Sequence, residues 1–378
     1  MRVLHVYRTY FPDPPGGIQE AIRQITLASA DYGVDSRVFT LSPSPHPAEL
    51  SYEGVTVLRA RSWAAPASCD VGGFEAIQRF ARAAKWADII HYHYPWPYAD
   101  LLELIVRPAK PKVMTYHSDI VRQRWLKRAY APLMHRTLGV LDAIIATSPP
   151  YAATSPVLTD PRYAKLVRVI PLGLKEDTYP QSADETIFKR LGLDSESPYF
   201  LFLGVLRYYK GVRFLVDAAQ QVKAPIVIAG DGPEAAALKA QAQALGLHTV
   251  IFAGHVSDAE KIALLKHCHA FILPSHLRSE AFGVVLIEAG MYGRAMISCG
   301  IDTGTSYANI DEETGFVVPP ERPDALSAAM NRLLGDPALT ARFGNAARQR
   351  YERLFSGPAL GRAHADLYQE IKRGHRSA

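Results

Sequence analysis

The sequence predicts an α/β fold made of two doubly wound parallel-sheet domains, and three observations lead to this prediction. Short apolar strands alternate with helix-length segments through both halves of the chain, the order that produces parallel sheets. The length of 378 residues exceeds that of one typical domain. Residues 171–185 contain two prolines and lose apolar periodicity, so they separate the two series.

The expected strands are short apolar runs bounded by turn residues. In the first half they cover residues 2–7, 36–41, 55–60, 88–93, 112–117, 142–148 and 167–171. In the second half they cover residues 199–204, 225–230, 250–254, 270–275, 295–299 and 315–319.

Helices are expected between these strands and after the last of them. The internal helices cover residues 18–32, 212–222, 234–245 and 257–267. Ser257 and Glu260 form a capping box for the last of these. The chain after Pro323 is expected to be helical at 325–334, 338–355 and 360–373. We therefore expect domains at 1–180 and 181–355, with a C-terminal helix at 356–378 packing back toward the first domain.

Composition narrows the class of protein. No apolar run reaches the roughly 18 residues that span a bilayer. The first residues read as a strand and not as a signal peptide. Three scattered cysteines, Cys69, Cys268 and Cys299, suit a reducing cytoplasmic setting better than a disulfide framework. The net charge of +5 is shared almost evenly between the two halves, which argues against a nucleic-acid partner.

One window departs from this balance. Residues 107–136 hold eight basic residues and one acid, Asp119, with Trp125, Leu126 and Tyr130 among them. The segment at 122–136 is a candidate basic amphipathic helix suited to anionic lipid head groups at the inner face of the cytoplasmic membrane. A solvated helix whose apolar face packs on the core explains the pattern equally well.

Two carboxylates near the end of the second half point to sugar transfer. Glu280 and Glu288 are eight residues apart, which is roughly 12 Å in a helix and matches the reach of a nucleoside diphosphate sugar. If the helix begins near Ala281, its free amides and dipole face a diphosphate. In the alternative interpretation, Glu280 is an acid in the first turn of a helix, Glu288 is a solvated helical residue, and neither binds a ligand. The apolar run at 284–287 weakens this interpretation, because a buried Glu288 needs a partner or a ligand.

Cations and glycines stand where phosphate is expected. Arg207 and Lys210 follow the strand at 199–204, where they could stabilise a leaving diphosphate, although two loop cations alone are ordinary. Gly16 and Gly17 follow the first strand and precede a helix, as in a phosphate-binding loop or a plain turn.

Polar and aromatic side chains end two strands of the first half. His117 and Asp119 follow the strand at 112–117, where His117 is either structural or faces a donor sugar. His91 and His93 share one strand face. Together with Tyr94, Trp96 and Tyr98 they could form a sugar-stacking acceptor surface, or they could be core and rim residues.

Other chemistries are not indicated. His267, Cys268 and His269 are adjacent, so they point apart and lack a fourth zinc ligand. The GDGPE segment at 230–234 holds only part of a dinucleotide fingerprint. No Asp-x-Asp pair indicates metal-dependent binding of a nucleotide sugar. We expect no cofactor and no metal.

Taken together, these segments resemble the retaining glycosyltransferases of family 4, which have the two-domain GT-B architecture. The most specific match is the Glu-x7-Glu element in SEAFGVVLIEA, at 279–289. The other matching segments are GGIQEAIRQ, TYHSDI, RVIPLGL, YYKG, IAGDGPE and FAGHVSD. The resemblance implies two Rossmann-like domains facing an interdomain cleft, with a C-terminal helix crossing back.

The resemblance also implies roles for individual residues. Catalytic roles fall to Glu280, His117, Lys210 and Arg207. Donor-binding roles fall to Glu288, Gly16, Gly17, Ala281, Phe282, Gly283 and Val256. Acceptor-binding roles fall to Asp119, His93, Tyr94 and Trp96. Many members carry an Arg at the position of Val205 in this chain. We expect Arg207, two residues later, to take the role of that Arg.

The segment at 300–320 resembles members that use GDP-mannose or related GDP-sugars to build bacterial surface polysaccharides, including mannosyltransferases and rhamnosyltransferases. We therefore expect a retaining, metal-independent hexosyltransferase that acts on a lipid-linked or oligosaccharide acceptor, as in lipopolysaccharide synthesis. The alternatives are a UDP-sugar-dependent transferase, a nucleotide-sugar epimerase or hydrolase of the same fold, and a non-catalytic sugar-nucleotide-binding scaffold.

Overall fold

The computed structural model describes residues 1–13, 16–66, 69–120 and 124–376, with the backbone alone at 124–127 and 376. The chain forms two compact units. Unit 1 comprises Met1–Gly173 and Gly357–Ala378, and unit 2 comprises Leu174–Ser356. The chain leaves unit 1 inside the predicted linker and returns to it for the last helix.

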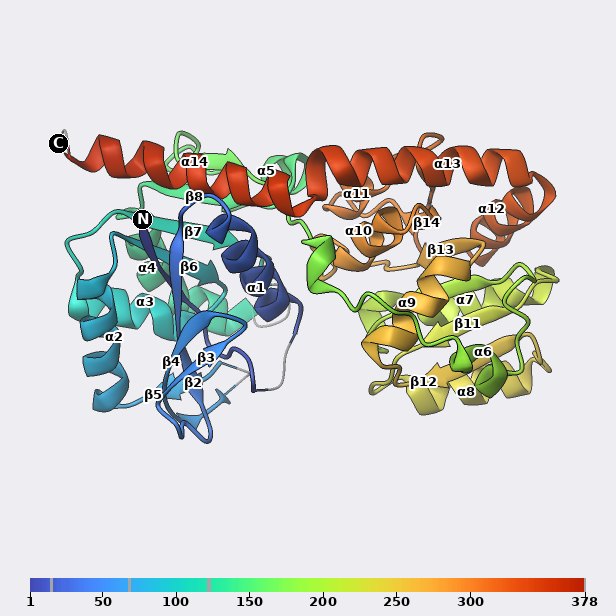
Figure 1. The fold of residues 1–378 in the computed structure, drawn as a ribbon, viewed down its shortest axis with the longest axis horizontal. Helices are drawn as coiled ribbons and strands as arrows, with labels where there is room; N and C mark the ends of the chain where they lie inside the picture. Colours follow the sequence, from blue (N-terminus) through green and yellow to red (C-terminus); the bar gives the residue numbers. More distant parts are fainter. Residues whose placement is uncertain (14–15, 67–68, 121–123, 377–378) are drawn as a thin grey trace. The chain divides into compact units, whose positions relative to one another are not determined.

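Unit 1 is built on one sheet, which has nine strands in the described part of the chain (Figure 1). Its main path runs β3-β4-β2-β1-β6-β7-β8-β9, and β5 pairs with β4. The strands are β1 (Arg2–Val6), β2 (Asp35–Ser42), β3 (Glu49–Tyr52), β4 (Val55–Ala64), β5 (Val71–Gly72), β6 (Ile89–Tyr94), β7 (Lys112–Tyr116), β8 (Ala143–Ala146) and β9 (Val167–Val169). All seven predicted strands are present and parallel, which confirms the doubly wound order.

The two strands that were not predicted, β3 and β5, are short and antiparallel to β4. Helices cover the sheet of unit 1: α1 (Gly17–Ala30), α2 (Phe74–Trp86), α3 (Pro97–Val106), α4 (Arg124–Leu138), α5 (Pro149–Thr154) and α14 (Gly357–Arg376). The last of them packs against α1, because Gly361 has no side chain to collide with the carbonyl of Ala28. Its Tyr368 lies in the core with Val3 and Ile89.

Unit 2 is built on a parallel sheet of six described strands in the order β12-β11-β10-β13-β14-β15. The strands are β10 (Phe200–Leu203), β11 (Ile226–Ala229), β12 (Val250–Gly254), β13 (Ala270–Leu273), β14 (Ala295–Cys299) and β15 (Gly315–Val318). All six were predicted. Apart from Ser298 in β14 their residues are apolar, because helices bury both faces of the sheet.

The helices of unit 2 are α6 (Thr186–Leu191), α7 (Val212–Ala218), α8 (Ala235–Ala244), α9 (Asp258–His267), α10 (Val284–Met291), α11 (Thr305–Ala308), α12 (Pro323–Gly335) and α13 (Pro337–Arg350). Short 3-10 turns lie at Glu176–Thr178, Tyr208–Lys210 and Ala219–Gln221. The capping box of Ser257 and Glu260 is present at the start of α9, as predicted. The predicted helix at 338–355 ends as α at Arg350, and a π-helical turn covers Tyr351–Phe355.

No helix in the described ranges is long and apolar enough to cross a membrane.

Candidate active-site residues

In unit 2, two loops meet at the carboxyl edge of the sheet. The loop after β10 carries Lys210, and the loop after the neighbouring strand β13 carries Glu280. Gly211 makes their close approach possible. It has φ +66°, and a Cβ there would lie 2.1 Å from the carbonyl oxygen of Pro274. The carboxyl edge of an open parallel sheet is where α/β folds bind ligands.

Lys210 and Glu280 form a nearly buried ion pair at this edge. The Lys210 Nζ donates to Glu280 Oε2 at 2.5 Å, and both side chains are 11% exposed. Ser275 Oγ donates to the same carboxylate oxygen at 3.2 Å. Burial acts to lower the pKa of Lys210, but the Glu280 carboxylate outweighs it and the net pKa is raised. Lys210 is therefore a cation at neutral pH.

The helix after this loop begins later than predicted. α10 begins at Val284, not near Ala281, and Gly283 caps it with φ +79°. Glu280 therefore lies in the loop and Glu288 in the helix, so the distance of 12 Å for an unbroken helix does not apply. Phe282 is buried, and the carbonyl of Ala281 accepts a hydrogen bond from the Gly304 amide at 2.9 Å.

Glu288 is buried, as the apolar run at 284–287 indicated, and it has protein partners. Its Oε1 accepts hydrogen bonds from Tyr179 Oη and Lys261 Nζ, each at 3.0 Å. Burial acts to lower the pKa of Lys261, but Glu288 and Asp258 raise it overall. Tyr179 and Lys261 were not predicted, because neither stands in a motif that singles it out. The only signal was the general need of a buried carboxylate for a cation.

The remaining predicted residues of unit 2 lie on nearby loops. Arg207 is exposed, and its positive charge acts to lower the pKa of Lys210 without reversing the net increase. Val205, where many relatives carry Arg, is also exposed. Val256 follows β12 and packs against the core of the unit.

In unit 1, Gly16 and Gly17 begin the helix that follows β1. Gly16 is the extended N-cap of α1 and Gly17 is its first residue, with open space where a side chain would lie. Both glycines are exposed, and neither has a side chain that could cover the first amides of α1.

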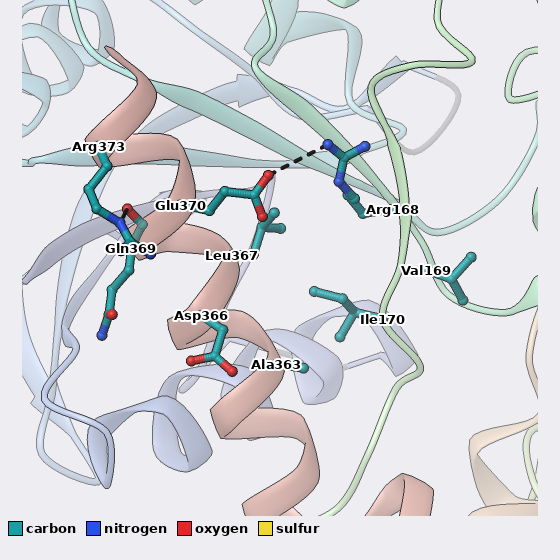
Figure 2. Close-up of a pocket in the computed structure, with 9 residues that line it drawn as sticks. All are labelled: Arg168, Val169, Ile170, Ala363, Asp366, Leu367, Gln369, Glu370 and Arg373. Carbon is teal, nitrogen blue, oxygen red and sulfur yellow. Dashed lines mark hydrogen bonds and ion pairs between the residues drawn. The ribbon is translucent and has the colours of Figure 1, made fainter. Parts of the chain in front are cut away.

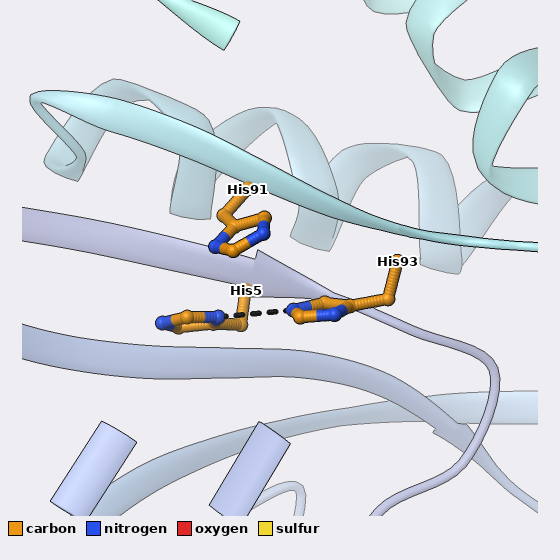
Figure 3. Close-up of side chains that lie close together, drawn as sticks. All are labelled: His5, His91 and His93. Carbon is orange, nitrogen blue, oxygen red and sulfur yellow. Dashed lines mark hydrogen bonds between the residues drawn. The ribbon is translucent and has the colours of Figure 1, made fainter. Parts of the chain in front are cut away.

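His117 follows β7 and belongs to a row of hydrogen-bonded histidines. Its amide donates to the carbonyl of Tyr94 at 3.1 Å, and its ring is almost fully buried. His117 Nε2 pairs with His93 Nδ1 at 3.0 Å, and His93 Nε2 pairs with His5 Nδ1 at 3.1 Å (Figure 3 shows the second pair). Burial lowers the pKa of each of these three rings, so all three are neutral at pH 7.

Two members of this row, with His91, form the group of three histidines in the described residues that could offer ligands to a metal ion. One ring nitrogen from each of His5, His91 and His93 lies within 4.8 Å of the others (Figure 3). However, His91 and His93 are stacked, and His91 already bonds Tyr368 Oη at 2.6 Å and Thr115 Oγ1 at 2.7 Å. The ring nitrogens therefore face hydrogen-bond partners and do not converge on one point.

The predicted acceptor surface around His93, Tyr94 and Trp96 is wrong for these side chains as the structure places them. All three are 1% exposed. Trp96 Nε1 donates to the carbonyl of Asp70, and Tyr94 stacks on Tyr116, so these rings form the core. Alternation along the strand does not reveal this, because helices cover both faces of the sheet.

Asp119, predicted to bind the acceptor, is half-buried in the loop after β7 and has several protein partners. Its carboxylate accepts hydrogen bonds from Tyr116 Oη at 2.9 Å, Ser155 Oγ at 2.9 Å and Tyr151 Oη at 3.1 Å. These bonds tie the loop after β7 to α5 and hold His117, two residues earlier, in place.

The basic window contains a helix, α4, as both alternatives of the prediction required. Arg122 and the side chains of Arg124, Trp125, Leu126 and Lys127 lie outside the described residues. Arg128 is exposed, Met134 is buried, and Tyr130 Oη donates to the buried Asp100. The later part of the helix therefore packs on the core.

A pocket of about 430 Å³ lies between β9 and α14 (Figure 2). Arg168 and Glu370 form an ion pair of 3.6 Å across it. None of the predicted site residues lines it.

These observations define the class of protein. Two α/β units built on parallel strands, with a last helix that belongs to the first unit, are the architecture of the GT-B fold of glycosyltransferases. Residues 16–173 match the model of a glycosyl transferase 4-like domain, and residues 183–350 match that of glycosyl transferases group 1.

Two relatives match along almost the whole chain. The D-rhamnosyltransferase WbpZ of Pseudomonas aeruginosa is 46% identical over 359 residues, covering 94% of this chain and 92% of the relative. The O-antigen chain mannosyltransferase C of Escherichia coli is 40% identical, covering 98% and 99%. Sucrose-phosphate synthase from Thermosynechococcus elongatus shares the fold, with a TM-score of 0.81 over 99% of each chain at 23% identity. The chain therefore belongs to the family 4 glycosyltransferases.

Proposed function

We propose that this chain is a retaining, metal-independent hexosyltransferase that moves a mannosyl or related deoxyhexosyl unit from a GDP-sugar to a hydroxyl of a lipid-linked or oligosaccharide acceptor during bacterial surface-polysaccharide synthesis. The observation that carries the proposal is the pair of buried Lys–Glu contacts in unit 2, Lys210 with Glu280 and Lys261 with Glu288. The names of the two relatives, a rhamnosyltransferase and a mannosyltransferase, support the choice of sugar.

In the proposed site, Lys210 is the cation for the diphosphate of the donor. The bond between the anomeric carbon and the phosphate oxygen breaks while negative charge grows on the diphosphate, and a fixed cation stabilises this charge. Arg207 adds a second cation, and Gly17 with the first amides of α1 contacts phosphate. Glu280 orients the hydroxyls of the donor sugar, and the amides of Phe282 and Gly283 lie beside it.

Glu288 holds the ribose. Its contacts with Lys261 and Tyr179 use Oε1, and they fix the carboxylate in one rotamer before the nucleotide arrives. Such preorganisation reduces the entropy lost on binding. Val256 contributes an apolar contact to the nucleotide.

The reaction needs no strong base. The acceptor hydroxyl attacks the anomeric carbon from the face that the diphosphate leaves, and the departing phosphate oxygen takes the hydroxyl proton. The new glycosidic bond then has the configuration of the donor. The protein supplies positioning and electrostatic stabilisation, and His117 contacts the donor sugar.

A panel of GDP- and UDP-sugars tests the choice of donor. A ligand at about 100 times its dissociation constant adds roughly 2.7 kcal/mol to the free energy of unfolding. We expect stabilisation by GDP-sugars and not by UDP-sugars, followed by transfer to a lipid-linked acceptor. Release of free sugar at the full rate without acceptor would favour a hydrolase, and binding without turnover would favour a scaffold.

We also propose that the chain works at the inner face of the cytoplasmic membrane through the basic window at 107–136. Each Lys or Arg near an anionic surface contributes about 1 kcal/mol. Co-sedimentation with liposomes should rise with anionic lipid, fall with added salt, and drop when Arg122, Arg124, Lys127 and Arg128 are changed together to Glu. Equal binding to neutral vesicles would contradict this electrostatic mode.

A further inference from the structure

Three histidines of unit 1 form a row in which each ring bonds the next through different nitrogens. His5 Nδ1 faces His93 Nε2 at 3.1 Å, and His93 Nδ1 faces His117 Nε2 at 3.0 Å. The row starts on β1, crosses to β6 and ends after β7, three neighbouring strands. We call these three residues the histidine row.

A neutral imidazole has one N–H donor and one bare acceptor nitrogen. In the buried row, a hydrogen bond between two rings requires one of each at every contact. Either every ring carries its proton on Nδ1, or every ring carries it on Nε2. Any mixed set places two lone pairs or two N–H groups against each other about 3 Å apart. The tautomer of His117 is therefore determined by the tautomers of His93 and His5.

The two ends of the row choose between the uniform states. His5 Nε2 is buried and has no partner within the described parts of the chain. It is an unpaired lone pair in the Nδ1–H state and an unpaired N–H in the other, and orphaned buried N–H groups are the rarer case. His117 Nδ1 is bonded by no described residue and is not among the buried unpaired atoms, so it stays accessible.

A neighbouring ring shows that the core tolerates a bare Nε2. His364 of α14 is buried, and its Nδ1 lies 3.0 Å from the carbonyl of Leu360, which can only accept. Its proton is therefore on Nδ1, and its buried Nε2 has no partner in the described structure. The Nδ1–H state of His5 repeats this arrangement.

We propose that the histidine row fixes His117 as the Nδ1–H tautomer, so that His5 and His93 are positioning residues that make His117 a hydrogen-bond donor toward the donor sugar. The part that concerns the sugar rests on the proposed function. His91 stacks on His93 with 4.4 Å between ring centres, but its own ring nitrogens bond Tyr368 and Thr115, so it is not part of the row.

The tautomers can be observed directly in the full chain labelled with ¹⁵N-histidine. Two-bond proton–nitrogen spectra at pH 7.5 distinguish protonated from bare ring nitrogens, and single substitutions assign the rings. We expect His5, His93 and His117 all to be Nδ1–H, with His364 as the internal reference. Any mixture of tautomers in the row, or a uniform Nε2–H row, overturns the proposal.

Two variants of similar size test the positioning role. In His93→Asn the side-chain amide can still donate to His117 Nε2, whereas in His93→Leu it cannot. We expect His93→Leu to release His117 to a mixture of tautomers and to lower kcat by roughly ten- to a hundredfold, at most the loss of one preorganised donor. His93→Asn should restore both readouts in part. An unchanged His117 spectrum or an unchanged kcat in His93→Leu contradicts the role.

The control is His364→Leu, which removes a buried histidine outside the row. Its kcat should stay within about twofold of the wild type, and the three tautomers should not change. If the wild-type chain transfers no sugar from any nucleotide sugar, the proposed function fails, and the spectra of the row still decide whether it fixes the tautomer of His117.

Discussion

At the scale of single residues, the candidate site of unit 2 contains two largely buried pairs of opposite charge. Lys210 with Glu280 and Lys261 with Glu288 each hold a cation beside a carboxylate with little access to water. Removing one partner of such a pair leaves an uncompensated charge and costs about 3–5 kcal/mol. Kinetic effects of these substitutions must therefore be measured under conditions in which each variant is folded.

Lys210→Ala should lower kcat by roughly a hundredfold, because the leaving diphosphate loses a preorganised cation. Arg207→Ala is the matched comparison. It should have a similar effect only if Arg207 replaces the Arg that is absent at Val205, and an unaffected Arg207→Ala enzyme would refute that substitution. EDTA should change neither enzyme. A wild-type rate in Lys210→Ala would remove Lys210 from the site.

The two glutamates should separate binding from turnover. Glu288→Ala should weaken nucleotide binding, because a ribose contact is shared by the ground and transition states. Glu280→Ala should mainly lower kcat, because the orientation of the donor sugar matters most as the bond breaks. Calorimetric titration with GDP and steady-state kinetics measure the two effects. Wild-type values in both variants would contradict the assignment of the site.

At the scale of elements, the sequence predicted every parallel strand in the described ranges. Most of these strands are buried apolar runs that stand out between turns, although β4 and β9 include exposed residues. The prediction missed β3 and β5, which are short edge strands with half-exposed or exposed residues. It also placed the start of α10 three residues too early, because a glycine with positive φ at 283 ends the loop later than the Phe-Gly pattern indicates.

For the candidate site, motif spacing singled out Glu280, Glu288 and Lys210, but not the partners of Glu288. Tyr179 and Lys261 come from segments 109 and 27 residues away from Glu288, and only the folded chain brings them together. Aromatic residues after a strand likewise do not reveal whether they face solvent. Trp96 illustrates this, since its indole N–H bonds a buried carbonyl.

The loop that carries Lys210 depends on Gly211. Gly211→Ala should destabilise the protein by well over 1 kcal/mol and lower activity, because a Cβ there would lie 2.1 Å from the Pro274 carbonyl. Gly246→Ala is the matched control. Gly246 has φ +65° but open space around it, so only the backbone term of about 1 kcal/mol applies. Equal unfolding midpoints for the two variants would contradict this packing.

At the scale of the whole molecule, the described part of unit 1 contains five buried histidines whose pKa values are lowered, chiefly by burial. They are His5, His91, His93, His117 and His364. Unfolding exposes these rings, so below pH 6.5 the unfolded state binds more protons than the folded state. One carboxyl acts in the opposite direction: burial raises the pKa of Asp100 to about 7.

We therefore expect the free energy of unfolding to be highest above pH 6.5 and to fall steeply as the pH drops toward 5. Each neutral buried histidine contributes up to about 1.4 kcal/mol per pH unit. Urea denaturation at several pH values measures the slope. His364→Gln should reduce this slope by the equivalent of about one bound proton. A free energy of unfolding that does not change between pH 7 and 5 would contradict the claim that these histidines are buried and neutral.

The most direct test of the proposed function is the configuration of the product. The full chain is incubated with GDP-mannose and a lipid-linked acceptor, and the anomeric configuration of the new linkage is determined by NMR. In the proposed reaction the diphosphate, bound by Lys210, leaves from the same face that the acceptor attacks. The new linkage should therefore have the same anomeric configuration as the donor. An inverted product, or no transfer from any GDP-sugar, would contradict the proposal.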